Sequence, residues 1–317
     1  MTLNKKKTSF CVKACLASST ALYLINKILY IKSISKERLF SSNSSYYNWK
    51  FGKIFYTVRG TGSPVLLVHD INCESSEYEW KNIVNSLAQT HTVYTIDLLG
   101  CGRSDKPMIT YTNYLYVQLI SDFVKNVIKH KVHIIATGLS SSACIMACYI
   151  EPQQIEKLTL VNPISLSKLS KSFKASNKLL KRMIEIPILG TFIYNIKYSN
   201  TMIRRRFRHK YFSNSDKVTR RMIQAYSEAA HLGGYASKYL MSSTCAKFVN
   251  ININRAVQSL NNDIQIIMGS DVPKCDSILN SYLALNPSIE TEIIPDTKYL
   301  PQMENPEEFL KLCEIYI

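Results

Sequence analysis

The stretch YTIDLLGCGRSDKP, residues 94–107, decides the fold of this 317-residue chain. Its first residues complete an alternating run of β-branched and aromatic side chains that begins at Thr92, which predicts a strand over 92–97. An Asp-x-x-Gly-x-Gly-x-Ser pattern then runs from Asp97 to Ser104. Such a pattern is specific enough to indicate one fold if the elements on either side agree with it.

The elements on either side alternate between strands and helices. Strands are expected at 53–62, 64–70, 92–97, 132–136, 157–163, 264–269 and 290–295. Helices are expected at 80–87, 114–129, 141–150 and 277–285 and from Pro306 to the end, and residues 41–49 look like a linker. This alternation predicts an α/β protein with a mostly parallel central sheet flanked by helices.

Four segments follow from this pattern. Residues 1–40 form a basic and apolar leader, and 50–163 form the first part of the α/β core. Residues 164–262 lack strong strands and are expected to be a basic helical cap inserted between core strands. Residues 263–317 complete the core.

The net charge of +16 is concentrated in two places. Residues 1–38 contribute +7 and residues 168–221 contribute +13, so the remainder is net negative. Basic surfaces of this kind suit an anionic membrane surface or another polyanion, or they are simply solvated. No aromatic and basic interleaving accompanies the arginines, so nucleic acid is not an expected partner.

The leader is mostly apolar from Phe10 to Ile31 and is long enough to cross a bilayer, although Lys13, Asn26 and Lys27 interrupt it. A lysine cluster at 5–7 precedes it. We expect membrane association through this single N-terminal segment. An interfacial helix or a basic arm on a cytoplasmic protein is the alternative.

Taken with LLVHD at 66–70, the strand and turn at 132–140 and IPDTKYLPQMENPEEF at 294–309, the glycine pattern resembles the α/β-hydrolase superfamily, in particular its serine esterases and lipases. The resemblance runs from about residue 50 to the C-terminus, apart from the insertion. It implies an α/β-hydrolase fold whose inserted cap acts as a lid.

In that family the nucleophile is the central serine of Gly-x-Ser-x-Gly, on a tight turn between a strand and a helix. The corresponding stretch here is ATGLSSSA, residues 136–143. Counting from either flanking element puts Gly138 at the nucleophile position, and glycine cannot attack a substrate. A shift of two residues makes Ser140 the candidate nucleophile, unless the serines only cap the following helix.

The other catalytic positions of the family also differ. Tyr299 stands at the histidine position, and a phenol is a poor general base at neutral pH. Val272 stands at the acid position, with Asp271 one place earlier as a candidate acid. His231 in the cap is the candidate replacement base, unless it packs between helices.

The oxyanion region carries His69-Asp70 where the family has His-Gly. A carboxylate there would disfavour a developing negative charge unless it points away. Two functions remain open: hydrolysis of an ester or lipid-like small molecule by a degenerate triad with Ser140 as nucleophile, or a non-catalytic binding or scaffold protein that retains the pocket and lid. Neither implies a metal or a cofactor.

Overall fold

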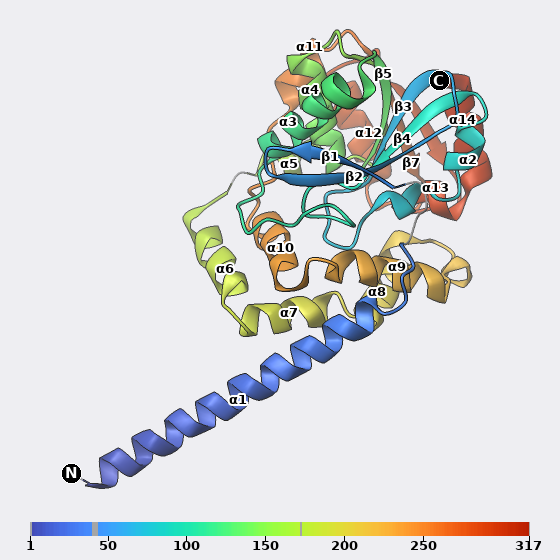
Figure 1. The fold of residues 1–317 in the computed structure, drawn as a ribbon. Coiled ribbons are helices and arrows are strands. Elements are labelled where there is room, and N and C mark those ends of the chain that lie inside the picture. The colour runs from blue at the N-terminus through green and yellow to red at the C-terminus, as the bar shows by residue number, and fades with distance from the viewer. Residues whose placement is uncertain (1, 40–43, 172, 317) are drawn as a thin grey trace.

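An eight-stranded sheet forms the centre of the protein (Figure 1). The computed structural model describes residues 2–39, 44–171 and 173–316. The strands are β1 (Ser45–Trp49), β2 (Gly52–Arg59), β3 (Ser63–Val68), β4 (His91–Ile96), β5 (Val132–Thr137), β6 (Ile155–Val161), β7 (Asp263–Gly269) and β8 (Glu290–Ile294), in the spatial order β1-β2-β4-β3-β5-β6-β7-β8. The pairs β1–β2 and β2–β4 are antiparallel and all others are parallel. The predicted α/β class is therefore confirmed.

Helices flank this sheet and also form a separate layer at one end of it (Figure 1). Those packed on the sheet are α2 (Val84–Leu87), α3 (Asn113–Phe123), α4 (Ser140–Ile150), α12 (Cys275–Leu283) and α14 (Pro306–Tyr316), and the short α13 (Pro301–Glu304) packs beside α14. Between β6 and β7 lie α5 (Leu166–Leu169), α6 (Ala175–Glu185), α7 (Leu189–Lys197), α8 (Asn200–Arg206), α9 (Arg220–His231), α10 (Lys238–Cys245) and α11 (Asn254–Ser259). We refer to α5–α10, with the turns between them, as the cap.

The turn after β4 shows why the glycine pattern is specific. Asp97 is buried, and its carboxylate accepts hydrogen bonds from the backbone N–H groups of Glu77, at 2.6 Å, and Arg103, at 2.8 Å. Gly102 has φ +47°, and an added Cβ would lie 2.2 Å from the Asp97 carboxylate. Only glycine fits beside this carboxylate, so the pattern fixes the path of the chain at the end of the strand.

The structure corrects the linker expected at 41–49. Residues 45–49 form β1, an edge strand that pairs with β2, whereas residues 40–43 lie outside the described residues. The aromatic side chains at 46, 47 and 49 favour a strand, and the buried Trp49 indole donates a hydrogen bond to Asp122 at 2.8 Å. The serine and asparagine residues at 41–45 concealed this signal.

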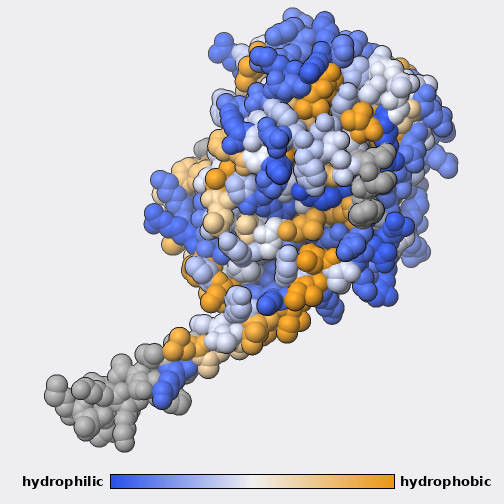
Figure 2. Space-filling model, in the orientation of Figure 1, coloured by the Kyte–Doolittle hydropathy of each residue, from blue (hydrophilic) through white to orange (hydrophobic). Residues whose placement is uncertain are grey.

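The leader is a long helix, α1 (Thr2–Ile34), that projects from the body of the protein (Figure 1). Its C-terminal half packs on the cap, where the Asn26 side chain donates to the Ile188 carbonyl at 3.0 Å and accepts from Asn195 at 2.9 Å. Figure 2 shows apolar side chains along its described surface. The exposed ones are Leu16, Tyr23, Leu24, Ile25, Ile28 and Ile31.

The prediction of an N-terminal membrane anchor is wrong. Within the described part of the chain, no helix is both long enough and apolar enough to cross a membrane. Lys13 and Lys27 interrupt the apolar run of α1, and Asn26 makes polar contacts with the cap.

Candidate functional site

The turn between β5 and α4 has Gly138 at its apex. Gly138 has φ +57°, in the left-handed region that side chains rarely adopt. A Cβ added there would lie 2.5 Å from Oδ1 of Asp70, which sits in the loop after β3. Both the backbone conformation and this neighbour therefore select glycine at the apex.

The serines that follow Gly138 point away from the cavity above the turn. Ser140 is fully buried, and its hydroxyl donates to the carbonyl of Thr137 at 2.7 Å. The Ser141 hydroxyl donates to the Ala136 carbonyl at 3.2 Å, and the Ser142 hydroxyl to the Leu139 carbonyl at 2.7 Å. The bonds of Ser140 and Ser141 join the first turn of α4 to the end of β5, and none of the three serines lines the cavity.

The sequence resemblance places Asp70 where serine hydrolases of this fold bind an oxyanion. In those enzymes one donor is the backbone N–H of the residue after the nucleophile. The equivalent N–H here is that of Leu139, and it donates to Asp70 Oδ1 at 2.7 Å. Burial raises the pKa of Asp70, whereas this N–H, the Ile71 N–H and the ammonium groups of Lys210 and Lys168 oppose the rise.

A second carboxyl group, Glu79, lies beside Asp70. Glu79 belongs to the 3-10 helix η1 (Glu77–Trp80), is buried, and accepts hydrogen bonds from the Thr137 hydroxyl at 3.1 Å and the Asp70 N–H at 3.4 Å. Burial raises its pKa to about 8, and the charge of Asp70 acts in the same direction. Glu79 is therefore mostly protonated at neutral pH.

We expect the stability of the protein to fall by about 2 kcal/mol between pH 6.5 and pH 8.5 because of Glu79. Its pKa in the folded state, about 8, exceeds the ordinary value of 4.5, so the folded protein binds more protons in this range and loses stability as they leave. Urea unfolding at the two pH values measures the change. Glu79→Gln should flatten the dependence, and an equally steep profile in that variant would contradict the assignment.

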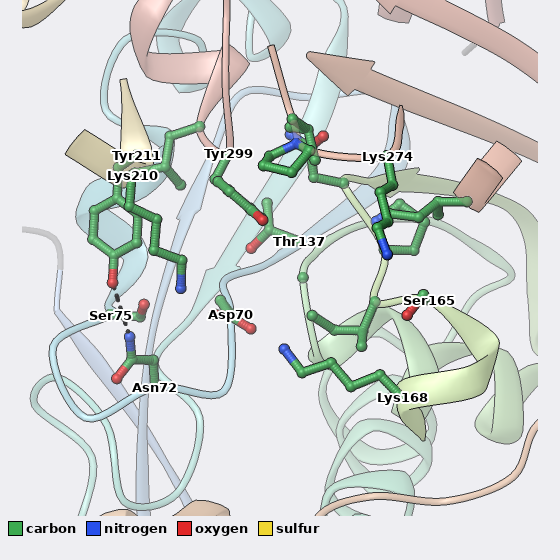
Figure 3. Close-up of a pocket in the computed structure, with 18 of the residues that line it drawn as sticks. Asp70, Asn72, Ser75, Thr137, Ser165, Lys168, Lys210, Tyr211, Lys274 and Tyr299 are labelled. Atoms are coloured by element: carbon green, nitrogen blue, oxygen red, sulfur yellow. Dashed lines mark hydrogen bonds between the residues drawn. The ribbon is translucent and has the colours of Figure 1, made fainter. Parts of the chain in front are cut away.

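Tyr299, which the sequence resemblance places at the family's histidine position, lines the cavity. It is half-buried, burial raises its pKa, and Figure 3 shows it pointing into the cavity. The Lys210 ammonium lies 5.3 Å from the centre of its ring. Val272, the residue that the resemblance places at the acid position, is buried and also lines the cavity.

The two remaining candidates of the triad lie apart from this cavity. Asp271 is exposed, and its carboxylate accepts hydrogen bonds from the Ser213 and Ser270 hydroxyls, which lower its pKa. His231 is buried in α9, where its Nδ1 donates to the Ser227 carbonyl at 2.7 Å, and burial lowers its pKa. The structure therefore does not bring Ser140, Asp271 and His231 together.

The ring of His69, the residue before Asp70, is held by two hydrogen bonds inside the protein. It is buried, its Nδ1 donates to the Asp70 carbonyl at 2.8 Å, and its Nε2 accepts from the Leu98 N–H at 3.0 Å. Burial lowers the pKa of the ring, which fits this neutral tautomer. The ring thus holds the loop that carries Asp70 against the end of β4.

The cavity itself has a volume of about 390 Å³ and lies between the carboxyl ends of the strands and the cap. Asp70, Glu79 and Gly138 line its floor. Lys168, Lys210 and Lys274 also line it, and Figure 3 shows Lys168 and Lys210 reaching toward Asp70 from opposite sides. Neither Glu79 nor the three lysines belong to the site residues expected from the sequence. The sequence offers one indication for two of these residues: Lys168 and Lys210 lie in the basic block at 168–221.

A buried ion pair joins the cap to the core beside this cavity. Glu74, in the loop after β3, is fully buried and accepts hydrogen bonds from Arg206 Nε, at 2.9 Å, and from Arg206 Nη2. The Tyr211 hydroxyl donates to the same carboxylate at 2.5 Å. Arg206 is one of the cations that made the cap basic, yet it faces the core.

Comparisons with known proteins agree with this geometry. Residues 64–184 match the family model described as alpha/beta hydrolase fold. A serine hydrolase involved in carbazole degradation superimposes with a TM-score of 0.71 at 18% identity, over 86% of this chain and 97% of its own. The protein thus has the α/β-hydrolase fold, with the cap inserted between β6 and β7.

Sequence relatives match a smaller part. An uncharacterized protein of Mycobacterium tuberculosis is 31% identical over 113 residues, which cover 36% of this chain and 33% of the relative. A soluble epoxide hydrolase of Corynebacterium sp. (strain C12) is 30% identical over 122 residues, covering 38% of this chain and 42% of the relative. The chain therefore spans well under half the length of these curated relatives.

Proposed function

We propose that this protein binds a small molecule in the cavity over β3 and β5 and does not hydrolyse it. One observation carries the proposal: the Asp70 carboxylate holds the Leu139 N–H beside a glycine at the apex of the turn. A tetrahedral intermediate formed there would place its negative charge against this carboxylate. Hydrolases instead direct free N–H donors at that point.

The surroundings of Gly138 support the same proposal. The apex offers no nucleophile, and the nearest serine hydroxyl, that of Ser140, is buried and donates to the Thr137 carbonyl. Burial raises the pKa of Tyr299, at the proposed histidine position, so even less of its phenol is ionised and able to accept a proton at neutral pH. A cavity nevertheless lies over the turn, and charged and polar groups line it together with apolar side chains.

Hydrolysis remains the alternative, because the named relatives include a soluble epoxide hydrolase and a serine hydrolase. Hydrolysis by Ser140 would require its side chain to leave the buried position and to lie within hydrogen-bond distance of a general base.

An assay with simple aryl esters and epoxides separates the two functions. We expect the wild-type protein to give no turnover above the buffer rate, and Ser140→Ala to leave this result unchanged while the protein stays folded. Turnover that Ser140→Ala abolishes would refute the proposed binding function. Turnover lost in His231→Gln or Asp271→Asn would identify the replacement base or acid.

A further inference from the structure

The three lysines of the cavity come from separate parts of the chain. Lys168 lies in α5, Lys210 in the π-helical turn η3 (Phe207–Tyr211), and Lys274 just before α12. Their convergence on one cavity is therefore a property of the fold and not of a local run of sequence.

None of these lysines forms an ion pair with a carboxylate of the residues that the structure describes. The ion pairs found among the described residues involve Arg103, Lys181, Arg206 and Lys311, and none of the three cavity lysines. Among the carboxyl groups that line the cavity, Glu79 is mostly neutral at pH 7, which leaves Asp70 to face three ammonium groups. The cavity thus carries excess positive charge, which attracts anions.

The floor of the cavity offers a hydrogen-bond acceptor, the Asp70 carboxylate. A carboxylate has about four acceptor positions, and the backbone N–H groups of Leu139 and Ile71 use two of those on Asp70. Asp70 lines the cavity and can therefore accept a further hydrogen bond from a bound molecule. The side chains of Ser165 and Ser277 add hydroxyl groups to the lining.

We infer that the cavity binds a small hydroxylated anion, whose phosphate or carboxylate group contacts Lys168, Lys210 and Lys274 and whose hydroxyl group donates to Asp70. This inference rests on the proposed function and names the class of its ligand. A volume of about 390 Å³ lies at the lower end of the range of small-molecule sites, which suits a compact ligand. An acyl chain would leave the three lysines unneutralised.

Isothermal titration calorimetry of the full chain tests the inference with four probes: glycerol 3-phosphate, glycerate, inorganic phosphate and glycerol. We expect both hydroxylated anions to bind, inorganic phosphate to bind more weakly, and glycerol not to bind. The first two probes distinguish a phosphate ligand from a carboxylate ligand. Raising the salt concentration should weaken binding of both anions, because charge attraction is screened.

Two matched triple variants locate the site. Lys168→Gln/Lys210→Gln/Lys274→Gln should reduce affinity for the hydroxylated anions at least tenfold. A control variant removes the same charge from exposed lysines elsewhere, at Lys125, Lys131 and Lys311, and should bind as the wild type does. Asp70→Asn should weaken glycerol 3-phosphate more than inorganic phosphate, because only the former offers a hydroxyl group on a carbon chain.

Several results would overturn the inference: equal affinities in the two triple variants, glycerol binding as tightly as glycerol 3-phosphate, or no binding of any anion by wild-type protein. The ester assay on the same preparations keeps the two proposals apart. If the protein shows neither ester turnover nor anion binding, the inferred ligand class is wrong and the proposal that the protein does not hydrolyse its ligand stands. Ester turnover that Ser140→Ala abolishes removes the proposed function, whatever the anions do.

Discussion

A variant carrying Gly138→Ser, Asp70→Gly and Tyr299→His should hydrolyse a simple aryl ester that the wild-type protein leaves intact. Each substitution restores one part of the machinery: a hydroxyl at the apex of the turn, a free Leu139 N–H, and an imidazole in the cavity. General-base assistance typically contributes 10²–10⁴-fold, so the gain should be visible above the buffer rate. Initial rates with an aryl acetate measure it.

Gly138 and Asp70 must change together. A Cβ at position 138 would lie 2.5 Å from Asp70 Oδ1, and the backbone there has φ +57°. Gly138→Ser alone should therefore lower the free energy of unfolding by about 1–3 kcal/mol from strain, with the clash adding to it. Adding Asp70→Gly removes the clash, so a double-mutant cycle should show favourable coupling between the two positions.

The matched control for the restored activity is Gly138→Ala in the same background of Asp70→Gly and Tyr299→His. It introduces the same Cβ and the same backbone strain without the hydroxyl. Equal rates in the serine and alanine versions would show that the apex does not present its side chain to the substrate. Adding Val272→Asp should raise the rate further if an acid at that position orients the new imidazole.

Much of the fold could be predicted because its signals are local. Apolar runs such as β3 and β5 are buried along most of their length, as parallel strands between helical layers must be. The position of Gly138 also followed from counting residues along β5 and α4. The edge strand β1 could not be recognised, since it has only five residues and directly follows a run of serine and asparagine residues that is typical of a linker.

The candidate site was harder to predict, because its residues meet only through tertiary packing. Lys168, Lys210 and Lys274 share no spacing, and the raised pKa of Glu79 results from burial that no local pattern records. The sequence raised the possibility that the carboxylate of Asp70 points away from the oxyanion position. Its contact with the Leu139 N–H depends on two loops that are 69 residues apart in the chain.

Arg206→Met should destabilise the protein by about 3–5 kcal/mol, because it leaves the fully buried Glu74 carboxylate without its cation. The Tyr211 hydroxyl would remain as a hydrogen-bond donor but supplies no charge. Urea unfolding of the variant measures the loss. Since this ion pair joins the cap to the loop after β3, its removal should also expose the cavity and weaken any ligand bound there.

A neighbouring arginine provides the control for this ion pair. Arg205→Met removes an exposed cation from the same helix and should change the stability little, as surface charges usually do. Combining Arg206→Met with Glu74→Gln should recover much of the loss, because the buried negative charge is then gone. If Arg206→Met proved as harmless as Arg205→Met, the pair would not hold the cap on the core, and the cavity would have to be closed by the apolar packing of the cap alone.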